Sequence, residues 1–373
     1  MAQTLIEQIE SGEYAPGAKL PTYRELMRQH DLTSGTVSYA MSILAEQGHV
    51  AKRHGSGVFA LSPGASVSDT NTGESLGWSS KPSSGLIALV VPEIKSGLYL
   101  SLQAGMEKSS RERSEQLITV TTGADVGQQA DVLIQLLDRG VAGIAMVPPY
   151  SSVPPHHLRM LQKQNIPLVL LHRGVPGIHA PVISIPFEDI GRLAGQALVK
   201  QGHQHVAIAL GQRSDVGDSY LRGFRAGLKL GRIELPDEYV MWPDHPLITA
   251  QDCADKLEFF KDSLGRMKHT ADRPTAIFAT FDRIGELAYL AAIQVGLSVP
   301  GDLSLICFGD KHRVGAILPR LSTIAVDEFE TGRKACELLA GMQIGSRSML
   351  SDEVIEVSVS LDPAETLGPP PTG

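Results

Sequence analysis

The sequence predicts an α/β protein made of a small helical domain at the N-terminus and a larger two-lobed domain built on parallel sheets. Two observations predict this class. Two short helix patterns and a hairpin pattern follow one another within residues 1–61. From residue 86 onward, short continuous apolar runs alternate with amphipathic helix patterns. Continuous apolar runs are typical of strands buried on both faces, and helices between them predict a parallel sheet covered on both sides.

The pattern of two short helices begins at residues 22–30. Thr22 stands at the start of this segment and Glu25 follows three positions later, which is the spacing of a capping box. In a capping box each of the two side chains accepts a hydrogen bond from the backbone N–H of the other residue. A helix is therefore predicted to begin at Thr22.

A second helix is predicted after a break at Asp31 and Leu32, with Thr33 or Ser34 as its N-cap. Its apolar residues recur at helical spacing and form one stripe: Val37, Ala40, Met41, Leu44 and Ala45. Gly48 follows as the stop. If the stripe faces the core, the opposite face presents short polar side chains around one aromatic ring: Gly35, Thr36, Ser38, Tyr39 and Ser42. Such a face is suited to close approach to a groove.

Two further runs, 50–53 and 58–61, flank His54-Gly55-Ser56-Gly57 and predict a β-hairpin. Two short helices joined by a tight turn form the helix-turn-helix arrangement, whose second helix enters the major groove of DNA. A hairpin behind them can act as a wing that reaches the DNA backbone or the minor groove. Residues 1–61 are therefore predicted to form a winged helix-turn-helix domain that binds DNA.

Residues 3–61 resemble the winged-helix domain of the GntR family of bacterial transcription regulators. The matching positions are Gly12, Pro16-Gly17, Leu20-Pro21, Arg24-Glu25-Leu26, Thr36-Val37, Ala40, Leu44, Gly48 and Gly55-Ser56-Gly57. The resemblance implies DNA contacts from both helices and from the wing, at Arg24, Arg28, Ser34, Gly35, Thr36, Ser38, Tyr39, Lys52, Arg53, His54, Gly55 and Gly57.

The chain departs from this family at Ser34 and Ser38, where the family usually carries arginines. Residues 1–61 contain five Lys or Arg against six Asp or Glu, so the domain has no excess of positive charge. Because phosphate neutralisation supplies much of the affinity for DNA, we expect one copy of the domain to bind modestly and a dimer to compensate. A preceding helix begins abruptly near Thr4, which leaves an earlier start codon as an open alternative.

The composition bounds the class of protein. The chain has 373 residues, of which 42% are hydrophobic and 20% charged, which suits two or three packed units. It lacks a run of eighteen apolar residues and a secretion signal, so a cytoplasmic location without a membrane partner is expected. Cys253, Cys307 and Cys336 lie far apart, which argues against disulfide and zinc frameworks. The net charge of −8 argues against a general polyanion binder but leaves room for a local DNA site.

The larger domain is predicted to contain two rounds of alternating strands and helices. The first round has strands at 86–92, 116–121, 143–147 and 168–171, and helices at 98–113, 127–139 and 155–164. The second has strands at 206–211, 276–280 and 303–308, and helices at 191–201, 219–230, 250–264 and 285–295. Two such rounds suggest two lobes with a cleft between them. Ligands of open sheets bind beyond the carboxyl ends of the strands, so residues directly after each apolar run are predicted to line the cleft.

Residues 86 to about 361 resemble the ligand-binding domain of the LacI family of effector-responsive repressors, which is itself similar to periplasmic sugar-binding proteins. The segments that carry the resemblance are Gly140-Val141-Ala142-Gly143-Ile144, Ile166-Pro167-Leu168-Val169-Leu170-Leu171, Gly202-His203, Val206-Ala207-Ile208, Arg222-Gly223-Phe224, Pro274-Thr275-Ala276-Ile277-Phe278, Asp282, Gly296-Leu297-Ser298-Val299-Pro300 and Leu318-Pro319-Arg320-Leu321-Ser322-Thr323. The resemblance implies a periplasmic-binding-protein-like fold in which three segments cross between the lobes, and a hinge that closes over an effector.

These patterns give a domain map. Residues 62–85 are rich in serine, glycine, threonine and proline and are predicted to be a flexible linker, with docking of Trp78 on a neighbouring surface as the alternative. The effector domain is expected over 86–362. Its lobes are expected at about 86–185 and 326–345 for lobe 1, and at about 186–325 and 346–362 for lobe 2. Residues 363–373 are expected to be a disordered tail.

The residues expected to bind the effector come from the strand ends and from the resemblance: Ser96, Tyr99, His172, Arg173, Arg222, Phe281, Asp282 and Asp310. Arg222 matches an arginine that clamps ligand hydroxyls or carboxylates in the family, and a guanidinium suits bidentate bonding. Tyr99 is expected to stack on the face of a sugar or base, with core packing as the alternative. Asp282 and Asp310 can equally cap the helices that follow them.

Several positions with acidic or amide side chains in the family differ in this chain. They are occupied by His172, Phe281 and Gly309, and the usual Asp-Asn pair is replaced by Pro186-Phe187. A cleft that loses hydrogen-bond acceptors and gains cationic and aromatic groups suits a neutral polyol less well. We therefore expect a sugar-class effector with an anionic or aromatic portion.

The sequence as a whole predicts a transcriptional regulator, a homodimeric repressor, whose affinity for operator DNA is controlled by a small-molecule effector. The alternative is a small-molecule sensor with a degenerate DNA-binding domain, and an enzyme built on the same lobes ranks third. No catalytic residue, cofactor or metal site is predicted. His156 and His157 point to different sides of a helix, and the sequence has no Gly-x-Ser-x-Gly elbow or paired catalytic carboxylates.

Overall fold

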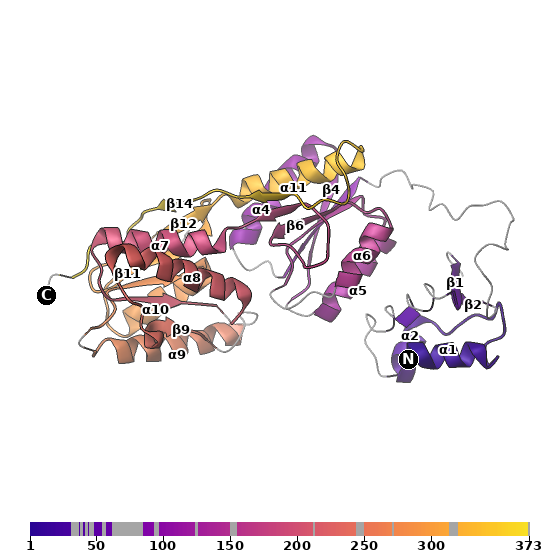
Figure 1. The fold of residues 1–373 in the computed structure, drawn as a ribbon, viewed down its shortest axis with the longest axis horizontal. Helices are drawn as coiled ribbons and strands as arrows, with labels where there is room; N and C mark the ends of the chain where they lie inside the picture. Colours follow the sequence, from indigo (N-terminus) through magenta and orange to yellow (C-terminus); the bar gives the residue numbers. More distant parts are fainter. Residues whose placement is uncertain are drawn as a thin grey trace. The chain divides into compact units, whose positions relative to one another are not determined.

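The computed structural model divides into two compact units. One comprises Met1–Ser84 with Asp125–Gly140, and the other comprises Gly85–Ala124 with Val141–Gly373. The structure describes residues 1–30, 37, 40–41, 44, 48–53, 57–61, 85–92, 97–123, 126–149, 155–211, 213–243, 250–270, 272–312 and 320–371 (Figure 1). No helix within these ranges is both long and apolar enough to span a lipid bilayer.

The first unit contains three helices and one hairpin among its described residues. The helices are α1 (Ala2–Glu10), α2 (Tyr23–His30) and α5 (Val126–Asp138). Strands β1 (Val50–Arg53) and β2 (Gly57–Ala60) pair antiparallel, with Val50 opposite Ala60 and Arg53 opposite Gly57. The predicted hairpin is therefore confirmed.

The core of this unit is built from the apolar residues that the helical periodicity singled out. Val37, Ala40, Met41 and Leu44 are all buried, as the predicted stripe requires. The cluster into which most of them pack contains Leu5, Ile6, Ile9, Leu20, Leu26, Val37, Met41, Leu44, Val50, Val58 and Ala60. Ala45, the last member of the predicted stripe, lies outside the described residues.

The capping box at the start of α2 is confirmed. The backbone N–H of Thr22 donates to Oε2 of Glu25 at 2.7 Å, and the N–H of Glu25 donates to Oγ1 of Thr22 at 3.3 Å. The hydrogen bond from the Thr22 backbone lowers the pKa of Glu25, because it stabilises the carboxylate. Two helix N–H groups that lack intrahelical partners are thus satisfied reciprocally.

Lobe 1 of the second unit is a parallel six-stranded sheet in the order β13-β7-β6-β5-β3-β4. Its strands are β3 (Leu86–Val91), β4 (Gln116–Thr121), β5 (Gly143–Met146), β6 (Leu168–His172), β7 (Val182–Ser184) and β13 (Val354–Glu356). The helices α4 (Gly97–Glu112), α6 (Pro155–Lys163) and α11 (Glu328–Gln343) belong to the same lobe. Residues of β3, β5 and β6 are buried along almost their whole length, as expected for strands covered on both faces.

Lobe 2 is a second six-stranded sheet in the order β14-β12-β11-β10-β8-β9, parallel except for β14. Its strands are β8 (Val206–Ala209), β9 (Val240–Met241), β10 (Ala276–Ala279), β11 (Ser304–Asp310), β12 (Ser322–Val326) and β14 (Val359–Asp362). Its helices are α7 (Phe187–Gln201), α8 (Asp215–Leu228), α9 (Ala250–Met267) and α10 (Asp282–Gln294), with short 3-10 turns at Lys229–Gly231 and Asp237–Tyr239.

Three segments cross between the lobes. They run from β7 to α7, from β12 to α11, and from β13 to β14. The prediction that 346–362 belongs entirely to lobe 2 is wrong, because β13 pairs in parallel with β7, placing Ile355 opposite Ile183 in the lobe 1 sheet. The third crossing therefore comes after Glu356, where backbone pairing with β7 ends.

The expectation of a disordered tail from residue 363 is wrong for 363–371. Thr366 is fully buried, and its Oγ1 accepts a hydrogen bond from the Ser322 N–H and donates one to the Leu305 carbonyl, both at 2.8 Å. The Gly368 carbonyl accepts a hydrogen bond from the hydroxyl of Ser304 at 3.0 Å. The end of the chain therefore completes the packing of β11 and β12.

Helix α11 returns to lobe 1 and packs closely against α4 (Figure 1). A Cβ atom added at Gly105 would lie 1.9 Å from the Phe329 carbonyl oxygen, and one added at Gly332 would lie 2.2 Å from the Leu102 carbonyl oxygen. The two backbones touch at these glycines because neither residue carries a side chain. The start of α11 is thereby fixed over the carboxyl ends of the lobe 1 strands.

Candidate functional site

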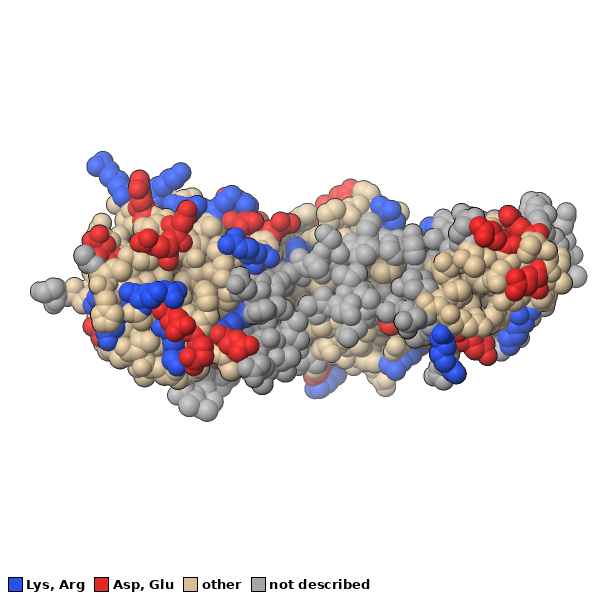
Figure 2. Space-filling view, turned by 90° about the horizontal axis from the view of Figure 1, so that it is seen from below, with Lys and Arg blue, Asp and Glu red and all other residues tan. Residues whose placement is uncertain are grey.

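The candidate DNA-binding residues that the structure describes fall on α2 and on the hairpin of the first unit. Arg24 and Arg28 lie on α2, where Arg28 is exposed, and Lys52, Arg53 and Gly57 lie in the hairpin. The other candidates lie outside the described residues: Ser34, Gly35, Thr36, Ser38, Tyr39, His54 and Gly55. On the face shown in Figure 2, the first unit carries both acidic and basic side chains, which agrees with the lack of a positive excess in residues 1–61.

The candidate effector residues of lobe 1 gather at the carboxyl end of β6. His172 is the last residue of β6, and its backbone has a φ of 67°, which is unusual for a residue other than glycine. The ring of Tyr99, from the first turn of α4, stacks on the His172 ring with centroids 5.9 Å apart and planes 13° apart. The half-buried Arg173 follows and donates to the Pro148 carbonyl after β5. Ser96 lies outside the described residues.

Next to the His172 ring lies a carboxyl group that sequence reasoning did not find. Nε2 of His172 and Oε2 of Glu328, the first residue of α11, are 3.1 Å apart. Glu328 is fully buried, and its Oε1 has no hydrogen-bond partner among the described residues. A buried carboxyl oxygen without a partner is costly, so the pair with His172 is the interaction that holds Glu328 in place.

Asp310 joins the two lobes at the end of β11. Its Oδ2 accepts a hydrogen bond from the hydroxyl of Ser101 on α4 at 2.6 Å and another from the His312 N–H at 2.9 Å. Its Oδ1 accepts from the Glu328 N–H at 3.1 Å. Both oxygens of this buried side chain therefore accept hydrogen bonds, from α4, from the residue after β11 and from the start of α11, which makes Asp310 a bridge between lobes.

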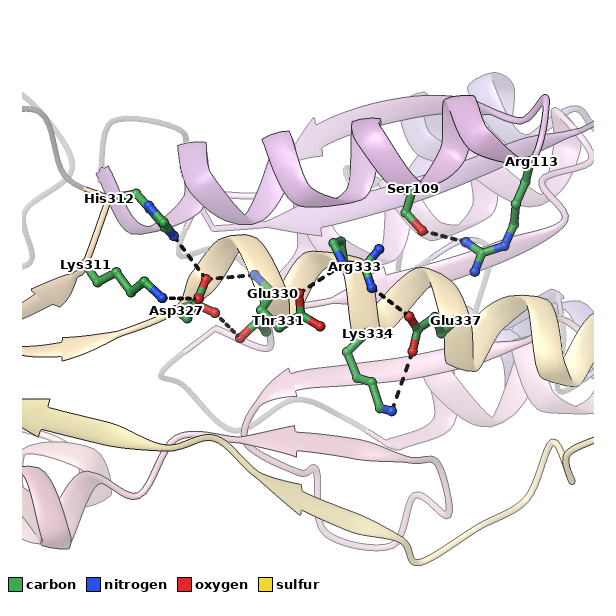
Figure 3. A network of polar contacts seen from close by, with 10 residues as sticks. All are labelled: Ser109, Arg113, Lys311, His312, Asp327, Glu330, Thr331, Arg333, Lys334 and Glu337. Carbon is green, nitrogen blue, oxygen red and sulfur yellow. Dashed lines mark hydrogen bonds and ion pairs between the residues drawn. The ribbon is translucent and has the colours of Figure 1, made fainter.

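Figure 3 shows a second set of polar contacts at the same crossing. Asp327 caps α11 by accepting the Glu330 N–H at 2.9 Å, and it pairs with Lys311 at 2.6 Å and with His312 at 3.3 Å. Burial opposes ionisation of Asp327, but the hydrogen bond from Lys311 and the cap outweigh it, so the pKa of Asp327 is lowered. The same hydrogen bond raises the pKa of Lys311. The ends of β11 and β12 are thus held together where the chain leaves lobe 2.

The same view continues along the exposed face of α11. Arg333 pairs with Glu330 at 2.9 Å and with Glu337 at 3.1 Å, and Lys334 also reaches Glu337 (Figure 3). Arg113, which directly follows the neighbouring α4, donates to the hydroxyl of Ser109 on that helix at 2.6 Å. Such exposed pairs at i,i+3 and i,i+4 each contribute only a few tenths of a kcal/mol, roughly 0.3–0.5.

In lobe 2, the candidates Phe281 and Asp282 stand where β10 gives way to α10. Asp282 is buried and accepts a hydrogen bond from the Arg283 backbone N–H at 2.7 Å, so its carboxylate binds the backbone at the start of α10. The Phe281 ring covers Gly211, where an added Cβ would lie 2.7 Å from its Cε1. Sequence reasoning missed Lys256 of α9, which is buried and whose Nζ donates to the Gly211 carbonyl at 3.0 Å. An aromatic ring and an ammonium group thus meet after β8, the lobe 2 counterpart of the β6 end.

Arg222 is not brought together with these strand-end residues. It is exposed on α8, where it pairs with Glu188 of α7 at 3.3 Å and donates to the hydroxyl of Ser219 at 3.0 Å. A hollow of about 400 Å³ lies beside it, lined by Phe187, Glu188, Asp189, Ser219 and the crossing residues Ile185, Pro186 and Glu356. Of the carboxylates that line this hollow, Glu188 pairs with Arg222, and Asp189 pairs with Arg192.

Three residues of these sites escaped sequence reasoning for different reasons. Glu328 comes two positions after β12, so the rule that ligands lie beyond strand ends would have included it if that strand had been predicted. Ser101 and Lys256 lie within helices, and no local signal distinguishes them from solvent-facing residues. Only the packing of α4 against β11 and of α9 near β8 gives them partners.

Family comparisons match both units. Residues 1–60 match the model of bacterial regulatory proteins of the gntR family. Residues 87–256 match a periplasmic binding protein domain, and residues 183–363 match a periplasmic binding protein-like domain. The two later matches together follow both lobes.

Similar proteins include two regulators and one solved structure. The arabinose metabolism transcriptional repressor of Geobacillus stearothermophilus is 26% identical over 346 residues, covering 92% of this chain and 90% of the relative. The repressor PurR of Aliivibrio fischeri is 26% identical over 256 residues, covering 68% of this chain and 73% of the relative. A LacI family transcriptional regulator from Enterococcus faecium, solved with bound ribose, has a TM-score of 0.62 at 21% identity, covering 76% of this chain and 99% of that structure.

The fold of the second unit, the matched family models and the regulator relatives agree with one another. The chain joins a region that matches the gntR family of bacterial regulatory proteins to a domain that matches periplasmic binding proteins, and it is an effector-controlled, DNA-binding transcriptional regulator.

Proposed function

We propose that this regulator is a cytoplasmic, homodimeric repressor whose affinity for operator DNA is controlled by a small molecule bound between its two lobes. The observation that carries the proposal is the gathering of Tyr99, His172 and Arg173 at the carboxyl end of β6, with Phe281 and Lys256 at the corresponding end of lobe 2. Open parallel sheets bind ligands at this edge. The regulator relatives support a non-catalytic function.

The proposed effector is a sugar or sugar derivative with an anionic or aromatic portion. A relative is named for arabinose metabolism, and a structure of the same fold holds ribose, which supports the sugar class. The side chains at the strand ends add cationic and aromatic character through Arg173, Lys256 and Phe281. Arg173 donates a hydrogen bond to the Pro148 carbonyl, and Lys256 donates one to the Gly211 carbonyl.

Calorimetry distinguishes the classes of effector. The full chain is titrated with neutral sugars, including arabinose and ribose, with their phosphates and with sugar acids. We expect the charged members to bind more tightly than the neutral parent sugars, and Arg173→Gln to remove that preference. Tight binding of a neutral sugar alone would overturn the proposed ligand chemistry while leaving the regulator function intact.

The proposed DNA contacts lie on both helices of the predicted helix-turn-helix and on the wing: Arg24, Arg28, Ser34, Gly35, Thr36, Ser38, Tyr39, Lys52, Arg53, His54, Gly55 and Gly57. A dimer would present two copies to half-sites about one turn of DNA apart, ~34 Å, or a multiple of this spacing. Doubling the contacts would offset the lack of excess positive charge in one copy.

Fluorescence anisotropy with labelled genomic fragments tests this function against a sensor with a degenerate DNA-binding domain. A regulator gives saturable binding to particular fragments that weakens with salt, and Arg28→Ala is expected to lower affinity on all fragments alike. A flat signal at every salt concentration would favour the sensor. Addition of the effector found by calorimetry then shows whether it releases DNA, as expected for a repressor that is induced.

The segments that cross between the lobes are proposed to couple effector binding to DNA binding. Asp310 bonds to Ser101 in lobe 1 and to the start of α11, so a change in the angle between lobes must alter these contacts. An effector that binds better to one angle shifts the population toward it. In the proposed dimer, that angle sets the spacing of the two DNA-binding domains.

A further inference from the structure

A groove on the outer edge of lobe 2 lies apart from the proposed effector site. It runs between the edge strand β9 with the preceding 3-10 turn and helix α9 (Figure 1). Its volume is about 510 Å³, which is within the range of small-molecule sites, roughly 300–1,000 Å³. None of the residues proposed for the effector site lines it.

The walls of the groove are aromatic and apolar. Trp242 and Phe259 are half-buried, and Tyr239, Met241 and Met267 are buried behind them. The hydroxyl of Tyr239 donates to the Asp272 carbonyl at 3.0 Å, which fixes its ring. From Phe259 to Met267 the helix advances by about 12 Å, enough to lie along a flat ring with one substituent. The groove therefore offers flat, partly preformed surfaces to a planar molecule.

Two arginines stand at this groove without a carboxylate partner among the described residues. The Arg213 guanidinium lies 5.2 Å from the centroid of the Trp242 ring, and Arg266 donates to the buried hydroxyl of Ser263 at 3.5 Å. Asp237, which also lines the groove, pairs with Arg225 at 2.6 Å. Among the described residues that line the groove, Glu238 is the only acidic side chain left to balance the two guanidinium groups, which leaves an excess of one positive charge.

We propose that this groove binds a planar aromatic monoanion, with the ring against Trp242 and Phe259 and the carboxylate on Arg213 or Arg266. A guanidinium that stacks on an aromatic face keeps its N–H edge free for a carboxylate, which it binds with two parallel hydrogen bonds. A neutral ring of the same shape gains the stacking but leaves the charge unmatched. The groove therefore binds the aromatic anion more tightly than the neutral ring.

Fluorescence of Trp242 tests the proposal in the full chain. Trp78 is the other tryptophan, so the Trp78→Phe variant makes Trp242 the single reporter. Benzoate is titrated at constant ionic strength, with benzyl alcohol as the neutral ring and acetate as the anion without a ring. We expect saturable quenching by benzoate below about 10 mM and at least tenfold weaker binding of the other two.

Substitutions then assign the charge. At least one of Arg213→Gln and Arg266→Gln is expected to weaken benzoate binding at least tenfold or to abolish its saturation, since the carboxylate is placed on one of these two guanidinium groups. Arg232→Gln, at an exposed arginine of the same lobe that does not line the groove, is the matched control and is expected to change nothing. Equal binding of benzyl alcohol, unchanged binding in both groove variants, or quenching that never saturates would each overturn the proposal. Thermal melting of each variant checks that it is folded.

Discussion

The pair of His172 and Glu328 shows how one residue can hold a crossing segment in place. The His172 backbone is left-handed, its ring stacks on the ring of Tyr99, and its Nε2 lies 3.1 Å from Oε2 of Glu328. Backbone strain of this kind persists only where surrounding contacts determine the conformation. Here the contacts come from three separate elements, β6, α4 and α11.

Replacing His172 alone should lower the free energy of unfolding more than replacing both His172 and Glu328. His172→Ala leaves the buried Glu328 carboxyl without a donor, and we expect a loss of about 3 kcal/mol in the free energy of unfolding of the second unit. Adding Glu328→Leu removes the stranded carboxyl and should recover part of that loss. Urea denaturation of the two variants measures the difference. A double variant less stable than His172→Ala would contradict a stabilising pair at this position.

Asp327 should make the stability of the crossing depend on pH. Its folded pKa lies below the ordinary value of 3.8, so its stabilising effect is present above that value and is lost as the pH falls through the folded pKa. Asp327→Asn keeps the helix cap and removes the charge. Its stability deficit should be complete at pH 7 and should vanish in acid, as measured by thermal unfolding across this range.

The control for Asp327 is an exposed pair. Asp189→Asn disrupts the i,i+3 pair with Arg192, which should contribute less than about 0.5 kcal/mol. If Asp327→Asn and Asp189→Asn gave the same small deficit at every pH, the contacts of Asp327 with Lys311 and His312 would not stabilise the crossing.

At the scale of elements, the contact between α4 and α11 decides where the crossing segments meet. Gly105 and Gly332 allow the two helix backbones to touch, and the N-terminal ends of both helices then reach Asp310. The sequence predicted α4 but gave no reason for its partner to be a helix more than two hundred residues later. Backbone contact at two glycines is a property of the pair of helices.

Identical substitutions at two helical glycines should have opposite effects. Gly332→Ala would place a Cβ 2.2 Å from the Leu102 carbonyl oxygen, which must separate the helices and should cost about 2 kcal/mol. Gly265→Ala in α9 meets nothing within 4 Å and should stabilise the protein by up to about 1 kcal/mol, because alanine favours helix. Chemical denaturation measures both. A neutral Gly332→Ala would show that the helices can move apart freely.

For the whole molecule, the end of the chain completes lobe 2. Thr366 lies between β11 and β12. Its hydroxyl donates to the Leu305 carbonyl of β11 and accepts from the Ser322 N–H of β12, so it links two backbone groups that do not bond to each other. His203 in the same region is buried, which lowers its pKa, and its Nε2 lies 3.0 Å from the Gly368 carbonyl oxygen. The last described residues therefore contribute to the folded core of the lobe.

Loss of the Thr366 hydroxyl should destabilise lobe 2. Thr366→Val keeps the shape of the side chain but leaves the Ser322 N–H and the Leu305 carbonyl without this partner, and we expect a loss of about 2 kcal/mol. Thr366→Ser retains the hydroxyl and should lose less. Guanidinium denaturation compares the two. Equal stability of Thr366→Val and the unchanged chain would show that the tail is dispensable.

The sequence by itself determined the domain order, the capping box at Thr22, the apolar stripe from Val37 to Leu44, and the α/β alternation of the lobes. These features depend on residues close together in the chain, whose spacing matches a helix or a buried strand. It also pointed to the carboxyl ends of the strands as the place for a ligand.

Only the tertiary structure decided the rest. The short strands β7, β9 and β13 have too few residues to show a period, and they exist because a neighbouring strand supplies hydrogen bonds. Glu328, Ser101 and Lys256 acquire their partners from elements far away in sequence. Arg222 pairs with Glu188 because the packing of α7 on α8 brings a carboxylate within reach, a contact that local spacing did not predict. Local spacing fixes which elements form, whereas the contacts between distant elements determine what each polar side chain meets.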